Sequence, residues 1–438
     1  MLFSEIQQQI QWPLWKKILF RFFFIFIFLY ITPWTWLDSL PYVYKLTEWY
    51  SNLEDLAVRF ANEKVFHVKE VLVHFSGKSD TSWVWAQLWT FLLLAIVVCL
   101  VWTLFDRRRN NYNKLDYWLC VFTRYYIAMV AFLFGFNKLL AIQMLFPTLS
   151  QLATPLGDFL PMRLSWMFMG YSTPYQVFSG AMEVLAGLLL LSRRTATFGT
   201  LVATGVFINV MTIDLSYDIG VKIFSMRLVL MCFFLLTHEY KRIISFFILN
   251  KPAEAGSIYN VSFSKKWMRI TRIVLKLIFI GSAVGWMFYT TLDSYKQINT
   301  PKNTGPVKTG VYDVVTFVLN KDTIPSLTTD TLRWQDIIFD ENYVSFGSVK
   351  SNDTLFRRRY NRGYFSFFTD TVKQTIGFKK FPTDTSFIFF FNYLLPDSNT
   401  IQLRGKVRND SLFVTLKKSK RHFQLAERQF HWLTEATR

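Results

Sequence analysis

Charged side chains occur inside stretches of this chain that are otherwise apolar enough to cross a membrane. Arg124, Gly135 and Lys138 lie within the hydrophobic stretch Trp118 to Leu140, and a later apolar stretch contains Glu183. Charges at membrane depth are costly, so they usually face a bundle interior, where they pair or serve a function. A guanidinium or ammonium group donates hydrogen bonds to ligand oxygens, and a carboxyl group of raised pKa can relay a proton. The sequence therefore predicts an ionisable centre within a membrane bundle.

Other polar residues are predicted at a similar depth. With a helical rise of 1.5 Å per residue, Glu183, Asn209 and Arg227 each fall roughly 6–10 Å below the outer end of a different predicted span. Lys138 and Lys222 fall at outer helix ends. The candidate ligand-binding residues are Arg124, Lys138, Glu183, Asn209, Lys222 and Arg227, and Glu183 is also the candidate catalytic group.

Two interpretations of this polar level remain open. Gly180, Glu183 and Gly187 share one helix face, so the carboxylate is expected to point into a closely packed bundle, toward Arg227 or Lys138. The first interpretation is a shallow polar pocket, open on the outer side, for a small or quinone-like ligand. The second is a set of buried ion pairs that only fixes helix register.

The composition and the loop charges indicate a polytopic membrane protein. The 438 residues are 52% hydrophobic and 18% aromatic, and the mean hydropathy is +0.22. Arg107–Arg109, Arg193–Arg194 and Lys241–Arg242 follow alternate spans, which predicts a cytoplasmic N-terminus, held by an uncleaved signal anchor, and an external C-terminal domain. We expect about seven spans, at 18–37, 86–105, 118–138, 176–192, 195–213, 221–238 and 267–290.

The net charge and the cysteines exclude two function classes. Although the chain carries a formal charge of +19, much of it lies in short loops that set orientation, and no nucleic-acid motif occurs. The three cysteines, Cys99, Cys120 and Cys232, all fall within predicted spans and form no C-x-x-C motif. We therefore expect no nucleic-acid partner and no thiol-exchange centre, and we interpret the thiols as inert core groups.

A domain of different composition follows the last span. Short alternating runs separated by turn residues predict seven or eight antiparallel strands, and hence a small all-β barrel or sandwich. Within it, Arg357, Arg358, Arg359 and Arg362 are expected to form a basic patch, either a solvated strand edge or a headgroup contact. The predicted strands are Val311–Leu319, Tyr343–Val349, Gly363–Phe368, Gln374–Phe378, Ser386–Leu394, Thr400–Val407 and Ser411–Leu416.

An amphipathic helix is predicted over residues 53–75, between the first two spans. Glu63, His67, Glu70 and His74 would follow a narrow stripe on this helix. Imidazole and carboxylate groups one turn apart suit zinc or iron, so these four residues are weak candidate metal ligands. A solvent-exposed polar face of an interfacial helix explains the same pattern. This alternative stays open because one helix rarely supplies a complete coordination shell.

These observations predict five segments. Two N-terminal spans with the external amphipathic helix are followed by a four-helix core, a cytoplasmic loop with a last span, a linker and the external β-domain. The corresponding ranges are 1–117, 118–240, 241–298, 299–308 and 309–438.

The core region resembles the DoxX-like family of small membrane proteins. The resemblance rests on Arg124-x10-Gly135-x2-Lys138, on Gly180-x-x-Glu183-x-x-x-Gly187 and on the basic turn Arg193-Arg194, over roughly 118–240. It implies a four-helix bundle in a bacterial cytoplasmic membrane, and some relatives are linked to quinone-coupled redox chemistry. The additional helices, the β-domain and an insertion at 139–175, expected as a lid along the outer interface, lie outside the family pattern.

Three functions are consistent with this sequence. The first is a redox-linked subunit that binds a quinone or another small ligand near Glu183, Arg227 and Lys138, although no cofactor fingerprint occurs. The second is a non-catalytic scaffold that presents the β-domain to an envelope protein partner. The third is a carrier or lipid-handling protein with the polar level as its substrate station.

Overall fold

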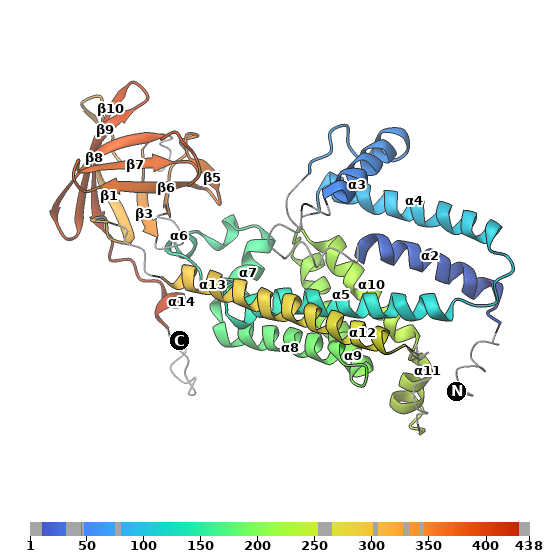
Figure 1. Ribbon diagram of the computed structural model, residues 1–438. Coiled ribbons are helices and arrows are strands. Elements are labelled where there is room, and N and C mark those ends of the chain that lie inside the picture. The colour runs from blue at the N-terminus through green and yellow to red at the C-terminus, as the bar shows by residue number, and fades with distance from the viewer. Residues whose placement is uncertain are drawn as a thin grey trace. The chain divides into compact units, whose positions relative to one another are not determined.

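A computed structural model describes residues 11–31, 45, 48–74, 80–252, 265–300, 305–326, 333–340 and 346–428. The chain forms two compact units, of which one is helical and the other contains a β-barrel (Figure 1). The helical unit comprises Met1–Met144 and Ser172–Asp293, and the barrel unit comprises Leu145–Tyr171 and Ser294–Arg438.

The helical unit contains several long apolar helices that could cross a membrane. Among the described residues, five helices are long and apolar enough, or six if the bent pair formed by α10 and the following helix is counted as one span. The described part of the first predicted span ends at Ile31, and its predicted end at residue 37 lies outside the described residues. The candidate spans and the other described helices from Leu14 to Asn299, apart from those of residues 145–171, are α2 Leu14–Ile31, α3 Glu48–Ala61, η3 Asn62–Phe66, α4 Ser82–Phe105, α5 Asn113–Leu139, α8 Thr173–Leu191, α9 Ala196–Ser216, α10 Lys222–Thr237, α11 Tyr240–Ile243, η5 Ile244–Ile248, α12 Lys266–Ile280, η6 Gly281–Trp286 and α13 Met287–Asn299.

Four of these helices form the centre of the unit. Contacts join α5 to α8, α8 to α9, α9 to α10 and α10 back to α5. The α5–α8 contact is close because a Cβ atom on Gly180 would lie 2.7 Å from the Gly135 carbonyl oxygen and 2.5 Å from the Leu139 nitrogen. Small residues allow such close helix packing. The core between the helices is filled by side chains such as Phe132 and Phe207.

The predicted amphipathic helix over 53–75 is too long. Helix α3 ends at Ala61, a short π-helical turn continues to Phe66, and His67 adopts a left-handed conformation with φ of 49°. The side chain of Asn62 then binds the backbone of the returning chain, accepting from the Val68 amide at 2.9 Å. This local bond ends the helix, so the stripe of candidate metal ligands does not continue beyond it.

The C-terminal domain is a closed antiparallel β-barrel. Eight strands pair in chain order, and β10 pairs with β1 to close the ring, while β2 and β5 are short additions. The structure thus decides for a barrel over a sandwich. The elements are β1 Gly310–Leu319, β2 Asp322–Thr323, β3 Asp336–Asp340, β4 Phe346–Val349, β5 Arg357–Arg359, β6 Arg362–Asp370, β7 Thr375–Lys379, β8 Phe389–Asp397, β9 Thr400–Val407, β10 Asp410–Lys418 and the short helix α14 Gln424–Glu427.

Aromatic side chains fill the interior of the barrel. Buried residues alternate with more exposed ones along β9, β10 and the first half of β8, where Phe389, Phe391 and Tyr393 are buried. Trp334 lies in this core and contacts the rings of Phe356 and Phe391. This alternation explains why hydrophobic patterning was sufficient to predict β9 and β10.

Residues 145–171, the central part of the 139–175 insertion that was expected as a lid, belong to the barrel unit. They form α6 Leu149–Leu152, η4 Leu156–Asp158 and α7 Pro161–Tyr171. Helix α6 packs on β3, all of whose residues are buried. The apolar contact joins Ile338 of β3 to Ala153 and Val311. Strand β3 therefore has no alternating pattern, and the sequence did not predict it.

A buried polar network lies beneath α6. The Asp340 carboxylate accepts hydrogen bonds from the amide and the hydroxyl of Ser150, and the Ser348 hydroxyl donates to Ser150 at 2.7 Å. Burial raises the pKa of Asp340. Arg362 donates to Ser348 at 2.9 Å and forms an ion pair with Asp336. Arg362 is only 2% exposed, so the expected basic patch is wrong for this residue.

Candidate functional site

Glu183 and Lys138 form a buried ion pair between α8 and α5. The side chains are 1% and 6% exposed, and the ammonium group donates directly to Oε1 of the carboxylate. Gly135 and Gly180 make this contact possible because they allow the two helices to approach closely. The carboxylate thus points into the bundle, and Lys138 is its counter-charge.

Asp214 and Lys222 extend the charged region. Asp214 is buried on α9 and interacts electrostatically with both Lys138 and Lys222. Lys222 forms a 2.7 Å ion pair with Asp218. Asp80 accepts hydrogen bonds from the Lys222 and Ile223 amides at 2.8 and 3.2 Å, which caps the start of α10. These charged residues therefore cap the start of α10 and stabilise contacts between helices.

Arg227 lines a separate small pocket of about 240 Å³. Its guanidinium group lies 4.2 Å from the centre of the Tyr30 ring. Glu54 of α3 also lines this pocket and accepts a hydrogen bond from Gln87. Burial raises the pKa of Glu54, while the Arg227 charge acts in the opposite direction. Among the described ion pairs none joins Arg227 to Glu183, so the predicted polar level is divided into two sites.

Asn209 does not line either site. It is exposed on α9, whose buried face is formed by residues such as Thr200, Thr204 and Phe207. Asn209 follows Phe207 by two positions, which rotates it by about 200° away from that face. Depth along a helix was predicted from the sequence, but the direction of the side chain was not.

Arg124 lines a larger pocket, here called the basic pocket, of about 440 Å³. Its walls are aromatic and aliphatic side chains of α5 and α12, including Trp118, Tyr125 and Trp267. Arg124 lies over the Tyr125 ring at 5.2 Å, and its Nε atom is buried without a hydrogen-bond partner. The four cationic residues that line it are Arg124, Arg193, Arg272 and Lys276, and its described lining contains no acidic residue.

The four candidate metal ligands near α3 do not gather. Glu63 pairs with the adjacent Lys64 at 2.6 Å. The His74 ring contacts the Trp83 ring at a tilt, with 4.2 Å between ring centres, and its Nε2 lies 3.7 Å from Asp55. His67 and Glu70 are exposed.

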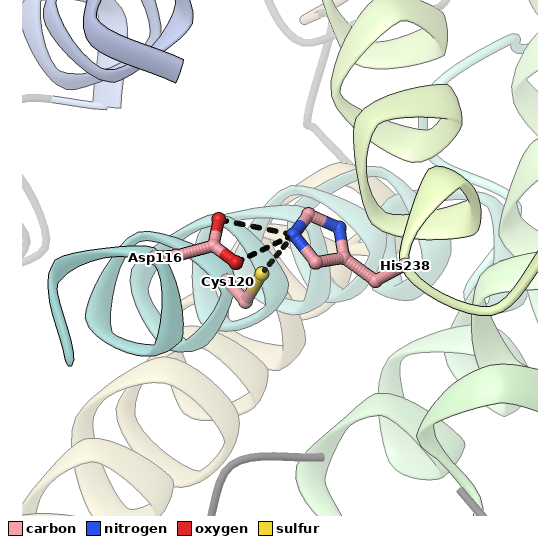
Figure 2. Close-up of side chains that lie close together, drawn as sticks. All are labelled: Asp116, Cys120 and His238. Atoms are coloured by element: carbon pink, nitrogen blue, oxygen red, sulfur yellow. Dashed lines mark hydrogen bonds and ion pairs between the residues drawn. The ribbon is translucent and has the colours of Figure 1, made fainter. Parts of the chain in front are cut away.

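A different group of possible metal ligands joins α5 to the end of α10. Asp116 and Cys120 project from α5 toward the ring of His238, as Figure 2 shows. Within the described part of the chain it is the one group of three His, Cys, Asp or Glu residues with suitably close ligand atoms. The four-residue interval between Asp116 and Cys120 is visible in the sequence. His238 joins them only through tertiary packing, which the interpretation of Cys120 as an inert core thiol did not foresee.

Comparisons with known proteins give one partial similarity. No protein-family model and no solved structure matches the chain. The chain is 37% identical over 84 residues to the uncharacterized protein YwoB of Bacillus subtilis (strain 168). This similarity covers 19% of the chain and spans 54% of the length of YwoB.

Proposed function

We propose that the protein is a multi-pass protein of a bacterial inner membrane whose helical unit binds an acidic phospholipid in the basic pocket. The observation that carries the proposal is the joint presence of four cationic side chains and aromatic walls in one pocket. A phosphate needs cationic donors, whereas acyl chains need an apolar wall. The function is therefore lipid recognition or lipid handling.

The size of the basic pocket supports this choice. Its volume of about 440 Å³ lies within the roughly 300–1,000 Å³ typical of ligand pockets. The Arg227 pocket, at about 240 Å³, falls below this range. The larger pocket also has no carboxylate in its described lining, so an anion would meet no repulsion there.

The predicted orientation supports the same ligand. The Arg193–Arg194 turn is predicted to lie in the cytoplasm by the positive-inside rule, and Arg193 lines the basic pocket. Basic pockets between helices on the cytoplasmic side are where acidic headgroups bind. We extend the proposal to a DoxX-like four-helix core of α5, α8, α9 and α10, supported by their mutual contacts and by the motif residues at the α5–α8 contact.

The experiment compares two double variants of α12 in the full-length protein. Arg272→Gln with Lys276→Gln removes two charges from the pocket, while Lys266→Gln with Arg269→Gln removes two charges of the same helix that do not line it. Native mass spectrometry measures the binding of phosphatidylglycerol and phosphatidylcholine. At about 1 kcal/mol per charge, the first variant should bind phosphatidylglycerol about 30-fold more weakly.

The control variant should bind phosphatidylglycerol like the wild type, and phosphatidylcholine binding should be similar in all three proteins. Equal losses in both double variants would show that overall charge attracts the lipid and would exclude the pocket. Unchanged binding in the pocket variant would exclude it as well. Melting temperatures of the variants establish that each is folded.

A quinone-binding, redox-linked subunit is the second candidate. It is favoured by the Arg227 pocket, where a guanidinium donor, the Tyr30 ring and the half-buried Glu54 surround one cavity. Arg227 would donate a hydrogen bond to a quinone oxygen. When an external donor supplies the electrons that reduce the quinone, Glu54 of raised pKa would supply a proton. Extraction and chromatography of the purified protein should then recover quinone from the wild type and not from Arg227→Gln.

A further inference from the structure

Asp116, Cys120 and His238 form a compact cluster that neither proposed ligand site uses. The His238 Nε2 atom lies 3.0 Å from each carboxylate oxygen of Asp116 and 3.5 Å from the Cys120 sulfur. Figure 2 shows all three side chains directed toward one point between α5 and the end of α10. The three ligand atoms lie within 4.8 Å of one another.

The hydrogen bonds of His238 determine which ring nitrogen faces the cluster. Its Nδ1 lies 3.0 Å from the Phe234 carbonyl oxygen, which can only accept, so Nδ1 carries a proton. In neutral imidazole, Nε2 then presents a lone pair toward the Asp116 carboxylate, which also only accepts. A shared proton or a metal ion must therefore lie between these two atoms, and either would bring positive charge to this position.

The position of Cys120 distinguishes these two sources of positive charge. An imidazolium ion has one Nε2–H, and the carboxylate at 3.0 Å satisfies it completely. A metal ion uses the carboxylate, the imidazole and the sulfur together. A histidine that donates its other N–H to a backbone carbonyl, as His238 does to Phe234, is also the usual arrangement of a metal ligand.

The distances fit tetrahedral zinc. With Zn–N and Zn–S bonds of about 2.0 and 2.3 Å, a tetrahedral angle separates the nitrogen and sulfur by about 3.5 Å. The His238–Cys120 distance is 3.5 Å. The same geometry separates the nitrogen and a carboxylate oxygen by about 3.3 Å, close to the 3.0 Å between His238 and Asp116. We propose that Asp116, Cys120 and His238 bind a zinc ion with one open coordination position.

The surroundings permit metal loading. The side chains of His238 and Asp116 are 31% and 19% exposed, so an ion can reach the cluster. The cluster lies at the start of α5 and just beyond the end of α10. On the predicted orientation this is the cytoplasmic end of both helices, where reducing conditions keep the Cys120 thiol available. Three protein ligands with a free fourth position are typical of zinc sites that bind water or a substrate.

Cobalt provides a direct test on the purified full-length protein after chelator treatment. We expect one Co²⁺ per chain, with a thiolate-to-cobalt charge-transfer band and tetrahedral visible bands that Zn²⁺ abolishes by displacement. Asp116→Asn and His238→Gln should weaken binding by at least the roughly 10–100-fold that loss of an outer-shell partner costs. Cys120→Asp should still bind cobalt but without the charge-transfer band.

Matched variants elsewhere in the chain serve as controls. Cys99→Ser removes another cysteine, and His422→Gln removes an exposed histidine that also lies beside a carboxylate. Both should bind cobalt like the wild type. Failure of the wild type to bind a stoichiometric ion, or a charge-transfer band that persists in Cys120→Asp, would overturn the proposal. If the wild type bound no metal and His238→Gln nevertheless lowered its stability, the cluster would be a simple imidazolium–carboxylate pair.

Discussion

Lys138 and Glu183 stabilise the helical unit as a pair, because each charge is buried and faces the other. Removing one partner of a buried pair leaves an uncompensated charge, whereas replacing both by apolar groups of similar size is often tolerated. The pair is therefore a structural unit whose two members must be changed together.

We predict that Glu183→Leu lowers the free energy of unfolding by about 3–5 kcal/mol. The double variant Lys138→Met with Glu183→Leu should recover most of this loss, since neither member of the pair is left without its partner and buried Asp214 keeps its interaction with Lys222. Thermal unfolding of the detergent-solubilised protein, followed by size-exclusion chromatography, measures both. If the double variant were less stable than Glu183→Leu, the pair would not be the cause of the loss.

The burial of Asp340 should make the stability of the barrel unit depend on pH. Burial raises its pKa above the ordinary value of 3.8, so the folded state binds this proton more tightly than the unfolded state. The resulting stability is fully present below the unfolded pKa and is lost as the pH rises through the folded pKa.

We expect Asp340→Asn to remove this dependence. The difference in barrel stability between wild type and Asp340→Asn should shift in favour of the variant as the pH rises above about 4, where the Asp340 carboxyl of the unfolded wild-type chain ionises. Hydrogen exchange of barrel peptides, compared between the two proteins at each pH, measures it. A difference that stays constant from pH 4 to pH 8 would mean that folding does not raise the pKa of this carboxyl.

Single residues also mark the limit of prediction from sequence. The sequence predicted either Arg227 or Lys138 as the partner of Glu183, because the glycine-lined face of its helix was expected to point into the bundle, and the structure pairs it with Lys138. Asn209 was misjudged in direction, since α9 had no sequence feature that fixed its rotation. The Cys120–His238 contact joins residues 118 positions apart, so only the packing of α10 on α5 reveals it.

Among the elements, α5 and α8 depend most on small residues. A Cβ atom on Gly180 would lie 2.5 Å from the backbone nitrogen of Leu139, and backbone cannot move aside as a flexible side chain can. A Cβ atom on Gly205 of α9 would have no neighbouring atom within 4 Å. Substitution by alanine at these two positions therefore adds the same methyl group to a crowded site and to an open one.

We predict that Gly180→Ala destabilises the protein, by about 1–3 kcal/mol through overpacking. Gly205→Ala should be neutral or stabilising by up to about 1 kcal/mol, because alanine favours the helix. Melting temperatures of both variants test the prediction, with Gly205→Ala as the control for the added methyl group. Similar destabilisation in both would mean that the α5–α8 contact has room for a methyl group.

Elements with a clear hydrophobic period were predictable, and those fixed by tertiary contacts were not. Strands β9 and β10 alternate, and the sequence located them. Strand β3 is buried on both faces because α6 covers it, so its short run Asp336–Asp340 gave no alternating signal. The amphipathic helix that contains α3 was predicted too long, because the Asn62 side-chain bonds that end it form only after the chain turns back.

In the whole molecule, the barrel unit is assembled from two separate parts of the chain. Residues 145–171 contribute hydrogen bonds from Ser150 to Asp340 and from Asn361 to Asp158, together with the apolar cover over Ile338. The β-domain expected from the sequence at 309–438 therefore lacks a part of its own surface.

We predict that a fragment of residues 305–438 is less stable than the same fragment joined through a flexible linker to residues 145–171. Exposure of the Ile338 side chain alone should cost about 1.5–3 kcal/mol. Urea unfolding followed by the fluorescence of the buried Trp334 compares the two fragments. The joined fragment carrying Ile338→Ser is the control, and it should lose much of the advantage. Equal stability of the two fragments would contradict the structural role of the segment.

The divided origin of the barrel unit also sets an order of events during synthesis. Ser150 and its partner Asp340 are 190 positions apart. At roughly 5–20 residues per second, the ribosome needs about 10–40 s to deliver the strand on which α6 settles. Until then the nascent 145–171 segment has no docking surface, so a chaperone or the bilayer interface would have to shield its apolar side chains.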